Sequence, residues 1–228
     1  MITKKLRCIH RHSIEEHPNC FAKGQVKQAI KNEKEWTKVT GRPWYQYPEF
    51  KVCYLDIETD NLKADFGTIL SWAVKEKEGP IYTKVITKQE LFQEIDVDKE
   101  MVKSLLELLK QYKIVVTYYG TGFDIPFVRS KALHYGLEFP EYGQLYHHDL
   151  FYLVKSKMNL ARKSLDSVCN YLGIVGKTEI DKEVWRRAKY GNKQALKQVL
   201  EHNMGDVVIL EKLHNKVEPY RKWIKTSI

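Results

Sequence analysis

The sequence predicts an α/β protein built on a mixed β-sheet with helices on its faces. Short apolar, β-prone runs gather soon after residue 49, helical periodicity dominates the later part of the chain, and one helical segment separates two of the runs. Strands first, helices last, and a crossover helix between them are typical of a mixed sheet covered by helices.

Residues 1–48 differ in composition from the rest of the chain. They begin with a cluster of cysteine and histidine, continue through a stretch rich in Lys, Gln and Glu, and end in a segment where Gly41, Pro43 and Pro48 are interleaved with aromatic residues. Closely spaced glycine and proline residues are typical of an irregular linker. We therefore expect a boundary at residue 48, with a small Cys/His-rich extension before it and one α/β domain over 49–228.

The elements of that domain are expected from periodicity, breakers and caps. Ser164 is a good helix N-cap, and Gly173 is a good helix stop. The segment 150–154 is compatible with a strand end or with a helix. The expected strands are the run that starts at Lys51 and ends with residues 54–60, and the segments 68–74, 81–86 and 114–118. The expected helices span 101–109, 123–135, 164–172, 184–190 and 193–217.

The bulk composition favours a protein that binds a polyanion. The chain has 228 residues, a hydrophobic fraction of 43% and a formal net charge of +9. A basic protein that also carries a clustered acidic strand fits a polyanionic substrate and a metal-loaded site, although plain solubility charge is the alternative. We find no signal-peptide pattern at the N-terminus and no run long enough to span a bilayer. With Cys53 and Cys169 in apolar patterns, we expect reduced cysteines and a cytoplasmic, intracellular protein without membrane association.

The first candidate functional motif is Tyr54-Leu-Asp-Ile-Glu-Thr-Asp60, at the end of the first strand. Side chains alternate along a strand, so Asp56 and Glu58 share one face while their neighbours point into a core. Two adjacent carboxylates repel each other and are costly to desolvate, and Mg²⁺ or Mn²⁺ between them removes that cost. The alternative is a strand that simply ends in a polar loop.

Two further acidic positions follow in the chain. Asp124 comes after the Gly120-Thr-Gly122 turn and opens a helix, where a carboxylate could serve only the helix N-terminus. His202 and Asp206 lie at i and i+4 on a later helix, beside an apolar stripe. Taken locally, they are compatible with an ordinary helical His–Asp pair.

Taken together, these positions resemble the DEDD superfamily of 3′–5′ exonucleases, within the ribonuclease H-like fold. Asp56 and Glu58 match the first motif of that family, Asp124 the second and Asp206 the third. The resemblance covers roughly residues 50–220, and each motif alone is short. The stretch Lys163-Ser-Leu-Asp-Ser-Val-Cys-Asn-Tyr-Leu-Gly-Ile-Val-Gly-Lys177 is also similar to exonuclease domains of family B polymerases and their stand-alone relatives.

The resemblance implies hydrolysis of phosphodiester bonds in single-stranded DNA or RNA by a two-metal mechanism. The four carboxylates would bind two Mg²⁺ or Mn²⁺ ions, and His202 would orient or deprotonate the attacking water. Thr59, Tyr119 and Phe123 are the expected substrate contacts, and Asp149 is expected to act structurally or in an outer shell. A polymerase or repair partner is compatible with this function.

Two residues depart from the family pattern. Tyr-type members carry Tyr four residues before the last Asp and His-type members carry His five residues before it, whereas His202 is a histidine at the tyrosine spacing. Tyr119 stands where many relatives have Asn, so a substrate contact made by that Asn does not carry over to this chain from the resemblance, although a tyrosine ring can stack on a base.

The N-terminal cluster contains Cys8-x-His10-x-His12 and His17-Pro-Asn-Cys20. Zinc takes four such ligands in closed structural sites, but the spacing within Cys8-x-His10 departs from the usual one. Two interpretations stay open, namely exposed histidines with unpaired thiols, and a zinc held by Cys8, His17, Cys20 and either His10 or His12.

Two segments, 185–190 and 220–225, interleave aromatic and basic side chains. They suit phosphate contact with base stacking, and a solvated helix face explains each equally well.

Two other functions also remain open. One is a nucleic-acid-binding module on a retired nuclease fold, and the other is a structure-specific endonuclease of the ribonuclease H-like fold.

Overall fold

A five-stranded mixed sheet forms the centre of the protein. The computed structural model describes residues 51–141, 144–176 and 180–220. The strands lie in the order β3-β2-β1-β4-β5; β1 pairs antiparallel with β2 and parallel with β4, β2 pairs antiparallel with β3, and β4 pairs parallel with β5. The strands are β1 (Val52–Thr59), β2 (Ile69–Glu76), β3 (Ile81–Val85), β4 (Ile114–Thr117) and β5 (Tyr146–Asp149).

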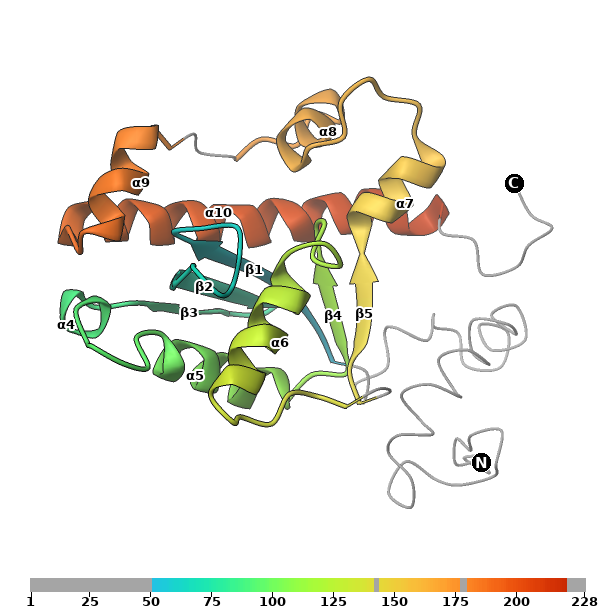
Figure 1. Ribbon diagram of the computed structural model, residues 1–228. Coiled ribbons are helices and arrows are strands. Elements are labelled where there is room, and N and C mark those ends of the chain that lie inside the picture. The colour runs from blue at the N-terminus through green and yellow to red at the C-terminus, as the bar shows by residue number, and fades with distance from the viewer. Residues whose placement is uncertain (1–50, 142–143, 177–179, 221–228) are drawn as a thin grey trace, which may run out of the picture.

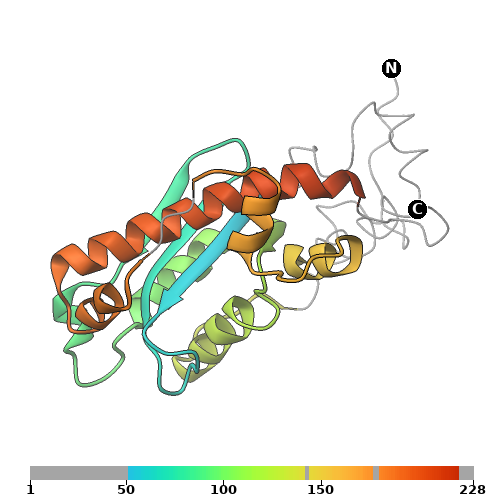
Figure 2. The same ribbon diagram turned by 90° about the horizontal axis from the view of Figure 1, so that it is seen from above.

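Helices cover both faces of this sheet (Figures 1 and 2). The longest, α10, packs on β1, β2 and β3 and runs along the whole sheet, while α5 and α6 lie on the opposite face (Figure 1). Within the described residues, no helix is both long and apolar enough to cross a bilayer. The helices are α4 (Lys88–Leu91), α5 (Lys99–Leu109), α6 (Asp124–His134), α7 (Leu150–Lys157), α8 (Leu165–Tyr171), α9 (Lys182–Lys189), α10 (Lys193–Val217) and a short 3₁₀ turn, η3 (Glu218–Tyr220).

The central strand β1 divides its side chains between two cores. Cys53, Leu55 and Ile57 pack with α5 and α6, whereas Val52 and Tyr54 pack with α7, α8 and the C-terminal half of α10. This alternation follows from the strand period of two. It means that the even-numbered positions of β1 face α10, and these positions include Asp56 and Glu58.

Most of the expected elements are confirmed within one to three residues. Ser164 caps α8 through a hydrogen bond that its Oγ accepts from the backbone N–H of Ser167, and Gly173 ends that helix region with a φ of +68°. The segment 150–154, for which two alternatives were open, belongs to the helix α7. The prediction was incomplete at β5, a four-residue strand of mostly polar residues, and at α4. Polar sequences such as Tyr-His-His-Asp lack the apolar run by which buried strands are identified.

Candidate metal and nuclease site

Two carboxylates of the site lie on β1. Asp56 and Glu58 both face α10, because they share the face of the strand that carries Tyr54. The main chain here is held firmly, since Asp56 and Glu58 stand opposite Ala73 and Ser71 on β2. The prediction that these two side chains share a face and that the intervening Ile57 is buried in a core is confirmed.

A third carboxylate reaches β1 from the start of α6. β4 pairs with β1 only as far as Tyr54, so the backbone N–H of Ile57 has no strand partner on that side. Asp124 accepts a hydrogen bond from this N–H with its Oδ1, at 3.1 Å. Its side chain is buried, with 3% exposed, so Asp124 does more than favour a helix N-terminus.

Helix α10 contributes three polar side chains to the same place. Asn203 donates a hydrogen bond from Nδ2 to Oδ2 of Asp56, at 2.5 Å. His202 Nε2 lies 3.7 Å from Oε1 of Glu58 and 3.8 Å from Oδ2 of Asp206. The imidazole therefore stands between a carboxylate of the sheet and a carboxylate of the helix. Glu58, His202 and Asp206 each offer one ligand atom within 4.8 Å of the others.

The electrostatics of the site reflect this crowding. Burial, then the negative charges of Glu58, Asp124 and Asp206, raise the pKa of Asp56 well above its usual value, and the hydrogen bond from Asn203 lowers it in part. Burial raises the pKa of Asp124 to about 7, against the lowering effect of the Ile57 N–H. Carboxylates that destabilise one another's charged forms fit a divalent cation, which supplies the missing positive charge through hard oxygen ligands.

The loop between β4 and α6 is held in place by Asp149, at the end of β5. Its carboxylate accepts hydrogen bonds from the backbone N–H groups of Tyr119 and Thr121, at 2.8 and 2.9 Å, and caps α7 by accepting one from Phe151. Tyr119 adopts a positive φ of 65°, which this anchoring stabilises. A Cβ at Gly120 would come within 2.3 Å of the Thr117 side chain, so the turn requires glycine. The expected structural role of Asp149 agrees with these contacts.

A cavity of about 440 Å³ opens beside the carboxylates. Its volume lies within the range of small-molecule sites. Its walls combine an acid of the site with apolar and basic side chains from the β1 end, the start of α6 and α9. It is lined by Glu58, Thr59, Asp60, Leu62, Phe123, Trp185, Arg186 and Lys189.

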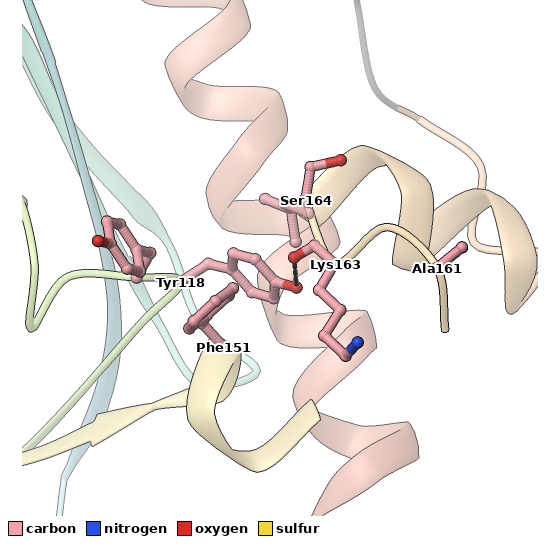
Figure 3. A pocket seen from close by; sticks show the side chains of 7 residues that line it. Tyr118, Phe151, Ala161, Lys163 and Ser164 are labelled. Atoms are coloured by element: carbon pink, nitrogen blue, oxygen red, sulfur yellow. Dashed lines mark hydrogen bonds between the residues drawn. The ribbon is translucent and has the colours of Figure 1, made fainter. Parts of the chain in front are cut away.

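A second cavity, of about 560 Å³, lies between the start of the β4–α6 loop, α7 and the segment that leads into α8 (Figure 3). Tyr118 and Phe151 form one wall and lie with ring centroids 5.9 Å apart, and Tyr118 donates a hydrogen bond to the backbone oxygen of Lys163 on the opposite wall. The ring of Tyr119, 47% exposed, packs on Phe151 as well. This cavity is open, aromatic and bordered by a lysine.

The structure thus brings Asp56, Glu58, Asp124, His202 and Asp206 together. Thr59 and Phe123 line the cavity beside them, whereas Tyr119 faces the second cavity. Of the two basic segments, 185–190 contributes Trp185, Arg186 and Lys189 to the first cavity, and positions 221–225 lie outside the described residues. The zinc hypothesis for Cys8, His10, His12, His17 and Cys20 and the boundary at residue 48 also fall outside the described residues.

Asn203 was missed by the sequence-based prediction. It is fully buried, and its Oδ1 accepts a hydrogen bond from Ser71 Oγ at 3.4 Å while its amide group reaches Asp56. The only available signal was a polar residue next to His202 on a helix with an apolar stripe. A buried asparagine requires partners, but its partners lie on β1 and β2, far away in sequence.

Comparison with known proteins agrees with this geometry. A family model described as the RNase_H superfamily matches residues 53–218. A DNA polymerase of Methanocaldococcus jannaschii is 36% identical over 59 residues, which cover 24% of this chain and 4% of the polymerase. A DNA polymerase of Pyrococcus glycovorans is 23% identical over 205 residues, which cover 75% of this chain and 25% of the polymerase.

The fold is shared with a solved polymerase structure. The family B DNA polymerase of the hyperthermophilic archaeon Pyrobaculum calidifontis superposes with a TM-score of 0.61 at 20% sequence identity, over 76% of this chain and 25% of the polymerase. The matches to the Pyrococcus glycovorans and Pyrobaculum calidifontis polymerases cover about three quarters of this chain, and this chain spans about a quarter of each polymerase. The resemblance drawn from the acidic motifs, to DEDD-type proteins related to family B polymerases, is confirmed. The chain belongs to the ribonuclease H superfamily.

Proposed function

We propose that this protein is a metal-dependent 3′–5′ exonuclease that hydrolyses single-stranded nucleic acid by a two-metal mechanism. Superfamily membership and similarity to DNA polymerases support a nuclease. One observation supports the finer proposal: four carboxylates from β1, α6 and α10 gather at one place, since Asp124 hydrogen-bonds the N–H of Ile57, between Asp56 and Glu58, and His202 lies 3.7 Å from Glu58 and 3.8 Å from Asp206. Four neighbouring carboxylates in a largely buried place lower the stability of the folded protein, so a functional role is the better explanation for them.

The donor set suits Mg²⁺ or Mn²⁺. Asp56, Glu58, Asp124 and Asp206 offer hard oxygen atoms, and Asn203 fixes one oxygen of Asp56 so that the other stays available for a ligand. When bound, two such cations would help to activate the attacking water and stabilise the charge that develops on the leaving 3′ oxygen. The protein supplies the fixed carboxylates and excludes bulk water from their buried sides.

His202 is the proposed proton acceptor. Water attacks phosphorus, the bond from phosphorus to the 3′ oxygen breaks, and the water proton needs an acceptor. The Nε2 of His202 lies between Glu58 and Asp206, next to the proposed cation ligands. Trp185 packs its ring edge-on to His202 with centroids 6.4 Å apart, and this contact restricts the imidazole orientation.

The two cavities would hold the strand. The 440 Å³ cavity is of suitable size for a terminal nucleotide, with Phe123 and Trp185 for the base and Arg186 and Lys189 near its phosphate. The aromatic cavity around Tyr118 and Tyr119 would take a base further from the 3′ end. In this arrangement the scissile phosphate would lie at the carboxylates beside the first cavity, which Glu58 lines.

Digestion of a single strand labelled at its 5′ end tests the proposal, with DNA and RNA strands assayed separately in Mn²⁺. A ladder that shortens one nucleotide at a time from the 3′ end, absent for Asp56→Asn, supports it. Internal cuts would indicate the endonuclease alternative. Binding without cleavage would indicate a retired nuclease fold. A strand blocked at its 3′ end is the matched control and should resist digestion.

A further inference from the structure

A second cluster of metal-ligating side chains lies at the far end of α10. His148 on β5, His214 in the last turns of α10 and Glu218 at the start of η3 are 7%, 5% and 7% exposed. Nε2 of His214 lies 3.1 Å and Nδ1 of His148 lies 3.7 Å from the same Oε2 of Glu218. One ligand atom from each residue lies within 4.8 Å of the others.

Two of the three separations, those to Glu218, fit a tetrahedral site. With metal–ligand distances near 2.0–2.1 Å, two ligands of a tetrahedral zinc are about 3.3 Å apart. The observed 3.1 and 3.7 Å fall on either side of that value. Small rotations of the buried rings would therefore bring the three atoms around one ion, with water in the fourth position.

Tyr54 orients one of the histidines. Its hydroxyl lies 3.0 Å from Nδ1 of His214, which leaves Nε2 directed toward Glu218. Metal-binding histidines commonly use their second ring nitrogen in such a hydrogen bond, because it selects the tautomer and fixes the ring. Tyr54 is itself fully buried on β1 and cannot move away easily.

We propose that His148, His214 and Glu218 form a binding site for a zinc-like divalent transition metal, separate from the nuclease carboxylates. His214 follows Asp206 by eight positions, and at about 1.5 Å per residue the two lie roughly 12 Å apart along the helix. Two imidazoles and one carboxylate are preferred ligands of zinc. A bound ion would cross-link β5 to the end of α10 through His148 and His214.

Metal binding by the full-length protein tests this site. Other candidate zinc ligands are removed first, in a Cys8→Ser/Cys20→Ser/Asp206→Asn background. After stripping with chelator, this protein should bind one equivalent of Zn²⁺ and show a melting temperature that rises with Zn²⁺ concentration. Co²⁺ should give a tetrahedral absorption spectrum without a thiolate charge-transfer band.

Variants in that background distinguish the site from a plain hydrogen-bond network. His148→Ala and His214→Gln should each lose the tight equivalent of Zn²⁺, whereas His134→Ala, which removes an exposed histidine, should keep it. Tyr54→Phe keeps all three ligands and should weaken Zn²⁺ binding by about 10–100-fold. The site is refuted if the background protein neither binds Zn²⁺ nor gains thermal stability from it, or if the His148 and His214 variants bind as well as the background does.

Discussion

Asn203 on α10 donates a hydrogen bond to Asp56 on β1, across a buried contact between the long helix and the central strand. The two residues are 147 positions apart in sequence. Asn203 therefore fixes the orientation of a carboxylate that stands next to three other carboxylates. We expect it to act as a positioning residue, since its own side chain is directed at Asp56 and Ser71.

We expect Asn203→Ala to weaken Mn²⁺ binding by about 10–100-fold, as substitutions behind metal ligands commonly do. The reason is that Asp56 loses the partner that holds its carboxylate in place. Calorimetric titration with Mn²⁺ measures the affinity, and saturating Mn²⁺ should restore most of the cleavage rate. Asn203→Asp adds a negative charge and should disturb the site more. Unchanged affinity in the alanine variant would show that Asn203 serves packing alone.

Asp56→Ala and Asp206→Ala should each abolish hydrolysis while leaving the fold and much of the nucleic-acid binding intact. Each removes a proposed cation ligand, whereas the basic surface that attracts the strand is unchanged. Without metal, both variants should melt at a higher temperature than the unmodified protein, because one repulsive buried charge is gone. Glu107→Ala on α5, an exposed acid, is the control. Normal cleavage by either variant would remove these residues from the active site.

His202→Ala should lower the single-turnover cleavage rate by roughly a hundredfold or more, with little change in substrate affinity. The imidazole near Glu58 and Asp206 is the proposed proton acceptor, and alanine removes it. The rate is measured from pH 5.5 to 8.5.

His202→Tyr separates positioning from proton transfer. A tyrosine hydroxyl stays protonated near neutral pH, so it can orient water but is a poor base. Partial recovery of the rate would assign His202 mainly to positioning, and no recovery would assign it to proton transfer. A wild-type rate and pH profile in the alanine variant would show that His202 is only a packed helical residue.

Asp124 predicts a pH dependence of stability in the absence of divalent cations. Its pKa is raised from 3.8 to about 7 by burial, so between these values the folded protein holds a proton that the unfolded chain has released. The contribution of Asp124 to the free energy of unfolding must then fall as the pH rises through this window. Urea unfolding in chelator at pH 5 and pH 8 measures this effect.

Asp124→Asn is the matched variant for that measurement. The amide oxygen can still accept the hydrogen bond from Ile57 but does not ionise. We expect the loss of stability between pH 5 and 8 to be smaller in the variant. Because cations bind the ionised carboxylate, the apparent affinity of the unmodified protein for Mn²⁺ should also weaken as the pH drops below about 7. Equal pH slopes for the two proteins would contradict the buried, protonated state of Asp124.

The cysteine and histidine cluster in the extension gives a separate prediction. Purified protein should carry tightly held zinc that depends on Cys8 and Cys20, because two thiolates and neighbouring histidines would supply the four ligands of a closed site. Elemental analysis of the Cys8→Ser/Cys20→Ser variant should show a loss of about one equivalent. No difference from unmodified protein grown with zinc would leave the cluster as ordinary exposed side chains.

Local sequence determined the elements and the residue types of the site. The period of β1 placed Asp56 and Glu58 on one face, and the apolar stripe of α10 placed Asp206 near its buried side. Both results follow from the geometry of an isolated strand or helix, which depends on neighbours a few residues away. The same local signals predicted the cap at Ser164 and the turn at Gly120.

The tertiary structure decided which partners those residues contact. The buried partners of Asp56 and Tyr54, namely Asn203 and His214, come from α10, and the loop of Tyr119 is held by Asp149. The polar strand β5, which carries His148 and Asp149, is stabilised by pairing with β4 and has no apolar run of its own. Hydrogen bonds between residues that are 30 to 160 positions apart depend on how the sheet and α10 pack together. No periodicity within one segment contains that information.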